Sequence, residues 1–393
     1  MKVYIKSFGC QMNDRDSEAL AGLFLDKGYI LTDNLEEAEI ILVNTCSVRE
    51  HAENRALSFL GTLRKVTKSQ SYKVTSNRRN TQYAIHDTKI VGLIGCMAKN
   101  RGEELLKKIS HLDLVIGPAN FDKIPYYIEK IRKEGVRIID IEDKERKEDF
   151  YSSSFRFQKD YAYVVISTGC SNFCSYCVVP YVRGELRLRK PSDIIREVER
   201  NVKLGIKKIT LLGQNVNDYQ YKSSVGGYRS LVNFVDLLRM VGEVEGLEEI
   251  DFVTSHPKNT SPELFELMAK SNKIKKHLHL PFQSGSDRIL RLMNRGYTKN
   301  DYLKLVSSYK EVVGGTLSTD VIVGFPTETE EDFLQTKEVL EKVRFKYAYI
   351  FKYSPRPRTK AQLLGDDVEK REKERRHRIL LELQKKISLS QDS

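Results

Sequence analysis

Residues 161–177 read YAYVVISTGCSNFCSYC, and this stretch decides how the second half of the chain is interpreted. An apolar run of strand length, residues 161–166, leads directly into three closely spaced cysteines. Further runs of strand length follow at residues 208–212, 249–253, 277–280, 316–323 and 347–353, and helical patterns such as 192–204 and 330–343 separate most of them. Strands alternating with helices predict a parallel α/β fold. Six strand–helix units are fewer than the eight of a closed barrel, so we expect a partial (βα)6 barrel with the cysteine loop at the carboxyl end of its first strand.

The loop carries Cys170, Cys174 and Cys177 in a C-x3-C-x2-C pattern. Thiolates are ligands that suit zinc and iron–sulfur clusters. A closed structural zinc site takes four ligands, usually as two pairs, whereas this loop supplies three and no fourth cysteine is near in the sequence. A [4Fe–4S] cluster held by three cysteines keeps one iron open to a small molecule. The spacing therefore favours a catalytic cluster over a structural metal site.

The first part of the chain, residues 1–148, also alternates strands and helices. We expect strands at residues 3–7, 39–44, 89–94, 114–116 and 136–139, and helices at residues 14–27, 50–63 and 101–109. This pattern predicts a parallel sheet covered on both faces. Cys10, Cys46 and Cys96 each follow one of the three longer strands, and the ends of parallel strands share one edge. The three thiols are therefore expected to converge and to hold a second cluster, although cysteines are also often simply buried.

Composition and charge bound the remaining possibilities. The chain has 393 residues and a net charge of +12, which favours polyanionic partners. Two segments, residues 54–86 and 344–360, carry lysine and arginine but no acid, which favours nucleic acid. The amino terminus does not resemble a secretory signal and no apolar run is long enough to cross a membrane, so we expect a cytoplasmic protein.

The domain boundaries follow from changes in composition. A charged stretch at residues 142–149 and serines at 152–154 indicate a linker. We therefore expect a first domain over residues 1–148, the barrel over 155–365 and a charged helix over 366–393. Residues 67–87 are polar, basic and without periodicity, which predicts a loop or an insertion.

The cysteine loop, with the aromatic Tyr176 before its third cysteine, resembles the signature of the radical S-adenosylmethionine (SAM) superfamily. The resemblance implies that Cys170, Cys174 and Cys177 are catalytic, because they hold the cluster that binds SAM and cleaves it to a 5′-deoxyadenosyl radical. Polar and glycine-rich turns after the later strands then resemble the SAM contacts of that superfamily. The expected cofactor-binding residues are Tyr176, Gly213, Gln214, Asn215, Gln283, Ser284, Asp320 and Gly324.

Further motifs extend the resemblance over nearly the whole chain. Residues 8–13 (FGCQMN), 44–50 (NTCSVRE) and 95–98 (GCMA) are similar to the amino-terminal domain of radical SAM methylthiotransferases. Residues 280–286 (LPFQSGS) and 294–298 (NRGYT) match the same family. The resemblance implies two [4Fe–4S] clusters, the second being held by Cys10, Cys46 and Cys96 and carrying the sulfur to be inserted.

The Gln-Met-Asn after Cys10 favours the branch of this family that modifies tRNA. The implied reaction is methylthiolation of C2 of N6-isopentenyladenosine at position 37, with SAM also supplying the methyl group. The implied partners are the tRNA anticodon loop, a sulfur source and a low-potential electron donor of flavodoxin or ferredoxin type. No association with a membrane is expected. The family usually ends in a small RNA-binding β-barrel, the TRAM domain, and this chain stops before or at its start, so we expect that barrel to be absent from it.

An anticodon loop is single stranded, so aromatic and basic side chains can bind its bases. Aromatic residues alternate along the last expected strand, and basic residues lie in or after it: Phe345, Tyr347, Tyr349, Phe351 and Tyr353, with Lys352, Arg356, Arg358 and Lys360. The alternative is that these aromatic rings fill the barrel core. Arg183, Arg187, Arg189 and Lys190 form a second candidate contact.

Two other functions fit parts of the pattern. The first is the same chemistry on an aspartate of a small-subunit ribosomal protein, which the basic insertion at residues 67–87 and the Gln-Met-Asn motif disfavour. The second is a metal-stabilised RNA-binding module without enzymatic activity, which predicts bound zinc and no binding of SAM.

Overall fold

The computed structural model describes residues 1–47, 50–68, 89–143, 148–225 and 228–391. The loop or insertion expected at residues 67–87 lies almost entirely outside the described residues. The contacts divide the chain into two compact units. The first unit is Met1–Phe157 with Tyr181–Gly184, and the second is Gln158–Pro180 with Glu185–Ser393. None of the described helices combines the length and the apolar character needed to cross a membrane.

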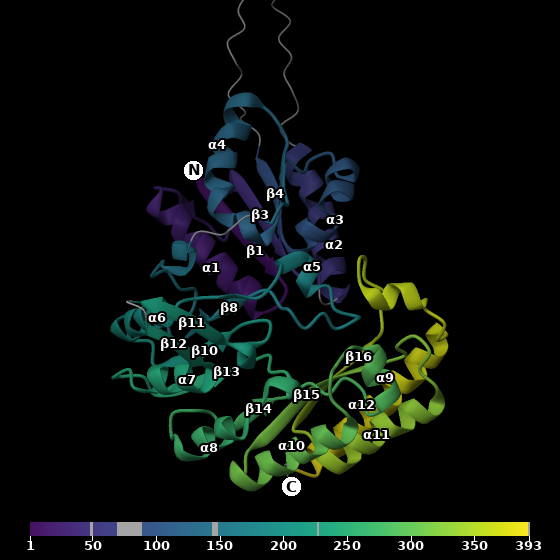
Figure 1. Ribbon diagram of the computed structural model, residues 1–393. Helices are drawn as coiled ribbons and strands as arrows, with labels where there is room; N and C mark the ends of the chain where they lie inside the picture. Colours follow the sequence, from purple (N-terminus) through teal and green to yellow (C-terminus); the bar gives the residue numbers. More distant parts are fainter. Residues whose placement is uncertain (48–49, 69–88, 144–147, 226–227, 392–393) are drawn as a thin grey trace, which may run out of the picture. The chain divides into compact units, whose positions relative to one another are not determined.

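The first unit contains a six-stranded parallel sheet in the order β2-β1-β3-β4-β5-β6 (Figure 1). Its strands are β1 (Lys2–Phe8), β2 (Ile30–Leu31), β3 (Ile40–Thr45), β4 (Ile90–Gly95), β5 (Leu114–Ile116) and β6 (Ile138–Asp140). Its helices are α1 (Gln11–Asp26), α2 (Glu50–Lys68), α3 (Cys96–Lys108) and α4 (Ile124–Glu134), with 3-10 turns η1 (Pro118–Lys123) and η2 (Glu148–Tyr151). Every residue of β3 and β4 is buried, as expected of central parallel strands covered on both faces. The predicted parallel sheet is confirmed.

Two helices of this unit begin earlier than the sequence predicted. Helix α1 begins directly after Cys10 rather than at residue 14, and α3 begins with Cys96 rather than at residue 101. Asn13 therefore lies inside α1 and does not cap it, and its side-chain amide donates to Asn44 at the end of β3. The earlier starts place Cys10 and Cys96 at helix amino termini, where the helix dipole favours a thiolate.

The linker expected between residues 142 and 154 is also partly wrong. Phe150 and Tyr151 are buried, at 7% and 3% exposure, so this stretch belongs to the core of the first unit. The ring of Phe150 lies 6.2 Å from that of Phe121, and the Tyr151 hydroxyl donates to Asp16 Oδ1 at 2.7 Å. The charges around this aromatic pair concealed it, because composition averages over neighbours that point in different directions.

The second unit is the partial barrel that the sequence predicted. Its strands are β7 (Tyr161–Val165), β10 (Lys208–Leu212), β13 (Glu249–Phe252), β14 (His277–His279), β15 (Thr316–Val323) and β16 (Tyr347–Lys352). They form two parallel sheets, β7-β10-β13 and β14-β15-β16, and an isolated parallel bridge joins Ile250 to Ile274 just before β14. The covering helices are α6 (Pro191–Lys203), α7 (Phe234–Gly242), α8 (Pro262–Lys270), α9 (Asp287–Leu292), α10 (Lys299–Val312) and α11 (Glu330–Val343).

Smaller elements complete this unit. They are the helix α5 (Val179–Arg183), whose last residues belong to the first unit, the 3-10 turns η3 (Val216–Asp218), η4 (Pro257–Asn259) and η5 (Lys360–Leu364), and the carboxyl-terminal helix α12 (Lys370–Leu389). Two antiparallel pairs were not predicted: β8 (Ser167–Thr168) with β9 (Arg187–Leu188), and β11 (Gln220–Val225) with β12 (Tyr228–Asn233).

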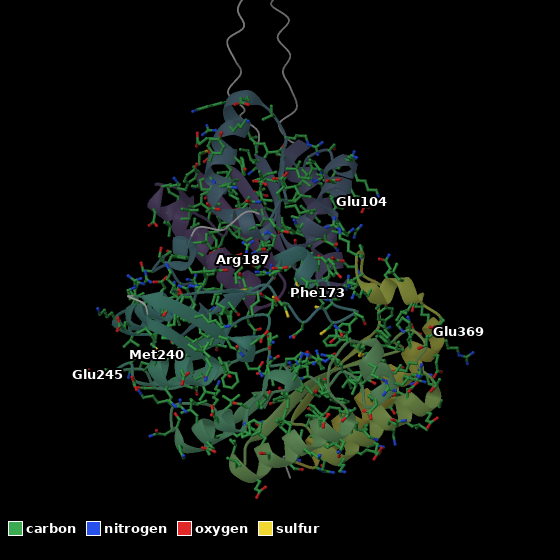
Figure 2. All side chains as sticks on the ribbon, viewed as in Figure 1. Glu104, Phe173, Arg187, Met240, Glu245 and Glu369 are labelled. Carbon is green, nitrogen blue, oxygen red and sulfur yellow. The ribbon has the colours of Figure 1, made fainter. Side chains whose placement is uncertain are left out.

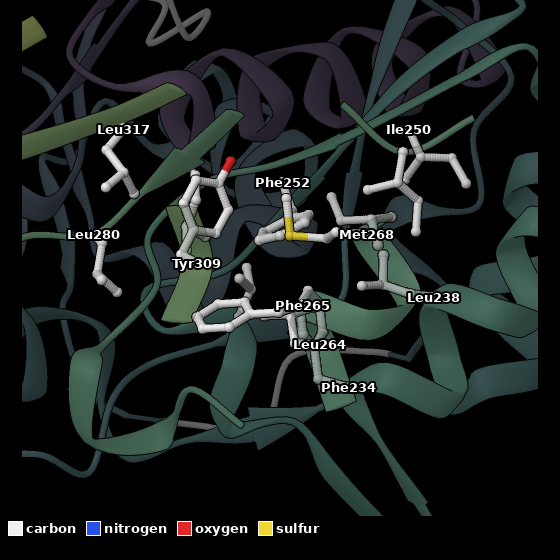
Figure 3. Packing of buried hydrophobic residues seen from close by; sticks show 14 of the residues in the cluster. Phe234, Leu238, Ile250, Phe252, Leu264, Phe265, Met268, Leu280, Tyr309 and Leu317 are labelled. Carbon is white, nitrogen blue, oxygen red and sulfur yellow. The ribbon is translucent and has the colours of Figure 1, made fainter. Parts of the chain in front are cut away.

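The barrel core lies between the strands and their helices. Figure 3 shows part of it, where Phe234, Phe252, Phe265, Met268 and Tyr309 pack together. The rings of Phe234 and Phe252 are 5.1 Å apart and meet edge to face, a favourable arrangement for aromatic pairs. This continuous apolar core fixes the strands whose carboxyl ends carry the cysteine loop and the polar turns.

The expected charged helix at the carboxyl end, α12, packs on β16 and α11 within the second unit. Leu380 is fully buried, and Arg376 forms a buried ion pair with Glu328 at 2.7 Å, with side chains 6% and 0% exposed. Burial raises the pKa of Glu328, although a hydrogen bond from Gly324 and the charge of Arg376 oppose that change. The pair joins α12 to the turn after β15.

We predict that Arg376→Met destabilises the second unit by about 3 kcal/mol, because the substitution leaves a buried carboxylate without its cation. The control is Arg375→Met, since Arg375 pairs with Glu372 on the surface and is 38% exposed. Its cost should stay below about 1 kcal/mol. Denaturant unfolding measures both values, and equal costs would show that α12 does not depend on this ion pair.

Candidate functional site

The register of the first sheet brings the scattered cysteines to one edge. Phe8 of β1 pairs with Thr45 of β3, and Thr45 pairs with Gly95 of β4, so these three residues stand side by side. Cys46 and Cys96 directly follow Thr45 and Gly95, and Cys10 comes two residues after Phe8. In the strand order, the chain goes from β1 to β2 on one side and from β3 to β4 on the other. Cys10 and Cys46 follow β1 and β3, the two strands at which this direction changes, and open α/β sheets bind ligands at this point.

Two glycines make this convergence sterically feasible. A side chain on Gly9 would come within 2.8 Å of the Cys46 β-carbon, so only glycine allows the two cysteine segments to approach this closely. Gly95 has φ +94°, and a β-carbon there would lie 2.6 Å from the carbonyl oxygen of Thr45. The glycines in the motifs around Cys10 and Cys96 are therefore explained by close packing of the chain with itself.

A buried amide pair holds the ends of β1 and β3 together. Asn13 Nδ2 donates to Asn44 Oδ1 at 2.9 Å and to the Thr45 carbonyl at 3.1 Å. Asn44 Nδ2 donates in return to the Asn13 carbonyl and to Ser17 Oγ, both at 2.9 Å. Asn13 Oδ1 also accepts from the Cys10 thiol at 3.2 Å. The asparagines of the two motifs thus position the cysteine segments.

A buried arginine supplies positive charge at this edge. The side chain of Arg183 is 4% exposed. Its Nε donates to Cys96 Sγ at 3.2 Å, and its Nη1 lies 2.9 Å from Asp16 Oδ2. A hydrogen bond from Cys46 lowers the pKa of Cys10 to about 6, and the charge of Arg183 acts in the same direction. Burial raises the pKa of Cys96, although Arg183 opposes the change. The sequence interpretation of Arg183 as an RNA contact is wrong, because the residue is buried in the first unit.

The donor set fits an iron–sulfur cluster. Three thiols share one edge, and the buried Arg183 Nη2 and Ser47 Oγ have no hydrogen-bond partner among the described residues. In the described part of the chain, no three His, Cys, Asp or Glu side chains are close enough together to hold a single metal ion. Cysteine thiolates are the usual protein ligands of iron–sulfur clusters.

In the second unit, the loop of Cys170, Cys174 and Cys177 is held by distant segments of the chain. Gln214 Oε1 accepts from the Gly169 amide at 2.6 Å, at the base of the loop. The Ser175 amide donates to the Met293 carbonyl at 3.0 Å, and Asn294 Nδ2 donates to the carbonyls of Asn172 and Phe173 at 3.2 and 3.1 Å. The Phe173 side chain, labelled in Figure 2, is 37% exposed at the tip of this loop.

Arg295 is buried behind the same loop and is 4% exposed. It donates to Cys174 Sγ at 3.4 Å, to the Pro281 carbonyl at 2.9 Å and to the Tyr297 hydroxyl at 3.0 Å. Burial raises the pKa of Cys177 to about 12, and the neighbouring Cys174 adds to that change. Arg295 was not among the expected site residues, and its only signal in the sequence is its place in the NRGYT motif.

The expected SAM contacts after the second strand all lie at the carboxyl end of β10. Gln214 bonds to the base of the cysteine loop, as described above. A β-carbon on Gly213 would lie 2.4 Å from Ser167 Oγ, so the glycine admits a neighbouring strand end. Asn215 is buried and donates to Asn259 at 3.2 Å, while its Oδ1 has no partner among the described residues.

The other residues expected to bind SAM differ in their contacts and burial. Gln283 has a φ angle of +68°, and its backbone N–H donates to the Asp320 carbonyl. The Asp320 carboxylate lies 3.4 Å from His279 Nε2. Ser284 is buried against Thr336 of α11, at 3.3 Å between the hydroxyls. A β-carbon on Gly324 would lie 2.3 Å from Lys373 of α12, so this glycine allows the turn after β15 and α12 to approach closely. Tyr176 accepts from Arg295 at 3.4 Å beside the cysteine loop.

Buried polar atoms without hydrogen-bond partners gather at the carboxyl ends of the first three barrel strands. Among the described residues they include Ser167 Oγ after β7, Asn215 Oδ1 after β10, and Ser255 Oγ and His256 Nε2 after β13. Burial lowers the pKa of His256 to about 2, so its imidazole is neutral. Such atoms are rare in folded proteins and fit a polar ligand. Ser255 and His256 were missed, because the third strand end contains no glycine-rich turn.

Some of the aromatic residues in and beside the last strand are exposed, as an RNA contact requires, and others are buried, as residues of the barrel core would be. Tyr347 and Tyr349 are 52% and 49% exposed, whereas Phe345 and Tyr353 are buried at 0% and 6%. The rings of His277 and His279 on β14 lie 6.5 and 6.1 Å from those of Tyr347 and Tyr349. Arg189 is not available to RNA, because it pairs with Glu197 at 2.6 Å and is 14% exposed.

Comparisons with known proteins agree with this division of the chain. Residues 164–340 match the radical SAM superfamily, and residues 2–117 match the family described as "Uncharacterized protein family UPF0004". A tRNA-2-methylthio-N(6)-dimethylallyladenosine synthase of Clostridium beijerinckii is 41% identical over 97% of this chain and 80% of the relative. The chain belongs to this synthase family. Relatives of the same name from Acetivibrio thermocellus and Geobacter metallireducens are 42% and 41% identical, each over 98% of this chain, which spans 77% and 83% of them.

Membership of the synthase family makes this chain a radical SAM methylthiotransferase, whose cofactors are SAM and two [4Fe–4S] clusters. The solved structures support the fold. The radical SAM methyltransferase TsrM from Kitasatospora setae covers 92% of this chain with a TM-score of 0.62 at 14% identity, and the match spans 76% of TsrM. The radical SAM enzyme OxsB gives a TM-score of 0.56 at 10% identity over 96% of this chain and 56% of OxsB.

We predict that Asn44→Ala lowers the free energy of unfolding by about 2 kcal/mol, because it removes the buried hydrogen bonds from Asn13 Nδ2 to Asn44 and from Asn44 to the Asn13 carbonyl and Ser17. The chain should also hold less iron, since the segments of Cys10 and Cys46 lose their common support. Denaturant unfolding and iron analysis measure the two effects. The control is Asn34→Ala at an exposed turn, which should change stability by less than about 0.5 kcal/mol. Wild-type stability and iron content in Asn44→Ala would contradict this role.

Proposed function

We propose that this chain transfers a methylthio group to C2 of N6-isopentenyladenosine at position 37 of tRNA. One observation carries the proposal: each unit gathers its own three cysteines at the carboxyl edge of its parallel strands. Two separate triads support two separate tasks, which a methylthio transfer requires. The printed names of the relatives, which are tRNA-2-methylthio-N(6)-dimethylallyladenosine synthases, support the substrate.

The residues of the two units support different roles in this reaction. When bound, the clusters supply the electron that cleaves SAM, at Cys170, Cys174 and Cys177, and the sulfur, at Cys10, Cys46 and Cys96. Gln214 and Asn294 hold the backbone of the first of these cysteine loops in place. The unpartnered polar atoms of Asn215 and Ser255 support binding of the polar part of SAM.

We predict that Cys174→Ala reduces formation of 5′-deoxyadenosine to background, because the first cluster loses a ligand. Cys46→Ala should retain SAM cleavage but form no methylthio product. Chromatography with mass spectrometry of the two products measures both outcomes. Equal loss of 5′-deoxyadenosine in the two variants would contradict separate tasks for the two triads.

We propose that the exposed rings of β16 bind bases of the tRNA anticodon loop. Tyr347 and Tyr349 project from neighbouring positions on one face of the strand, and their exposure leaves ring faces free for stacking. Lys346 Nζ lies 5.6 Å from the centre of the Tyr347 ring, so positive charge accompanies the aromatic surface. Single-stranded nucleic acid is commonly bound by this combination of stacking and charge.

We predict that Tyr349→Ala weakens tRNA binding about tenfold, because one stacked base is worth roughly 1–3 kcal/mol. SAM cleavage without tRNA should be unchanged. The control is Tyr126→Ala, which removes a ring of the same kind from α4 of the first unit, where Tyr126 is 65% exposed. Filter binding at fixed salt measures the affinities, and equal weakening by both substitutions would rule out a specific contact at Tyr349.

The remaining partners follow from the chemistry. We propose that a flavodoxin- or ferredoxin-type protein supplies the low-potential electron, because reductive cleavage of SAM requires a cluster at the low end of the iron–sulfur range. We also propose that the reaction takes place in the cytoplasm, where tRNA and such electron donors occur together.

Mass spectrometry of nucleosides tests the proposed function. Anaerobically reconstituted protein is incubated with SAM, reductant, sulfide and isopentenylated tRNA, and the tRNA is then digested. A methylthio mass increase on the modified adenosine is the expected result. Formation of 5′-deoxyadenosine with unchanged tRNA would overturn the substrate and leave the radical chemistry intact. The same assay would then be run on the small-subunit ribosomal protein.

A further inference from the structure

Arg183 has surroundings that a residue of purely structural function would not need. The side chain comes from the end of α5, shortly after Cys177 in the sequence, yet it is buried in the first unit beside Cys96. Asp16 balances its charge, and Tyr151 donates to the other oxygen of the same carboxylate at 2.7 Å. Burying an ion pair is expensive, so its retention beside three thiols calls for a function.

The unused donors of Arg183 lie on the side of the cysteines. In a guanidinium group, the Nε–H bond and one Nη2–H bond project in parallel from the same edge, which is why arginine binds anions in a two-pronged manner. Nε donates to Cys96 Sγ from this edge at 3.2 Å. Nη2 is buried and has no hydrogen-bond partner among the described residues. On this edge of the guanidinium group, Nε therefore donates to a cysteine sulfur, while the parallel Nη2 donor has no acceptor in the part of the chain that the structure describes.

Arg295 provides a comparison within the same chain. It also donates to a cysteine sulfur, Cys174, but each of its three nitrogens has a partner. Its Nε bonds to Tyr297, Nη1 to Cys174 and Nη2 to the Pro281 carbonyl. Every nitrogen of Arg295 thus has a partner in the protein, whereas the buried Nη2 of Arg183 has none among the described residues.

We propose that Arg183 is a positioning residue for the transferred sulfur and that its Nη2 group donates a hydrogen bond to an anionic sulfur species, hydrosulfide, at the second cluster. The inference rests on the proposed function, since it takes Cys10, Cys46 and Cys96 as the ligands of that cluster. A permanently charged, two-pronged donor suits a soft anion in a buried site, and the bond from Nε to Cys96 fixes the direction of the free N–H. Arg183 would then hold the sulfur without being a ligand of iron.

The test isolates the second cluster in the full-length chain. Cys170, Cys174 and Cys177 are all replaced by Ala, so that the reconstituted protein carries one cluster and cannot cleave SAM. Sodium hydrosulfide is titrated anaerobically into the reduced protein, and the electron paramagnetic resonance spectrum of the cluster reports binding. Saturable spectral change is expected for this background. The readout requires neither tRNA nor turnover.

Adding Arg183→Gln should raise the dissociation constant for hydrosulfide about tenfold to a hundredfold, as expected for loss of a hydrogen bond between charged groups. The control, Arg101→Gln, removes the same charge from α3, the helix that begins with Cys96, but from a side chain that is 30% exposed and paired with Glu104. Its dissociation constant should match the background. An unchanged constant in Arg183→Gln, at full iron content, would overturn the inference.

Arg183→Lys distinguishes the effect of the positive charge from the effect of the two parallel donors. It also tests the proposal in a variant that keeps the charge beside Asp16 and is therefore expected to fold. Lysine keeps the charge near Asp16 but lacks the second parallel donor, so hydrosulfide binding should remain weakened. Full recovery of wild-type binding by Lys would overturn the two-pronged contact. Iron content and circular dichroism are measured first. A background chain that assembles no cluster at all would instead count against the proposed function, so the two failures are distinguishable.

Discussion

Parallel strands all end at the same edge of a sheet, and the register of β1, β3 and β4 makes that edge a meeting point for thiols. Phe8, Thr45 and Gly95 stand side by side, and a cysteine follows each within two residues. A shift of one residue in this register would turn the cysteine segments apart, because side chains alternate between the faces of a strand. The glycine at position 9 and the amide pair of Asn13 and Asn44 depend on the same register.

In the second unit the cysteines also lie at the carboxyl ends of parallel strands, but a different set of contacts holds them there. The loop of Cys170 follows β7 and the short strand β8, and it is held by hydrogen bonds with Gln214, Asn294 and Ala361. These residues come from turns that are widely separated in the sequence. The first triad is therefore held by the regular pairing of strands, and the second by a loop that is fastened at several points.

Each of the two cysteine sites has a buried arginine side chain that donates a hydrogen bond to a cysteine sulfur. A guanidinium group removed from water needs an anion or several acceptors, and both Arg183 and Arg295 find a cysteine sulfur among theirs. Thiolates carry negative charge that the apolar surroundings would otherwise penalise. The arginines thus lower the cost of placing three thiolates together, while Asp16 and the carbonyl of Pro281 hold them in position.

The sequence by itself determined the classes of structure and chemistry. Apolar runs separated by helical patterns predicted the parallel sheet and the six barrel strands, and the position of each cysteine after a strand predicted both triads, because these signals are local and repeat along the chain. Only the tertiary structure decided which polar residues serve the sites. Arg183 was expected on an RNA-binding surface, but its side chain is buried beside Cys96. The turn at Gly324 packs closely against Lys373 of α12, which the local sequence did not indicate. Arg295, Ser255 and His256 were not among the expected site residues, and Tyr151 lies between the two stretches that indicated a linker. Their partners are distant in the sequence, and local composition carries no information about which distant group will neutralise or bury a given side chain.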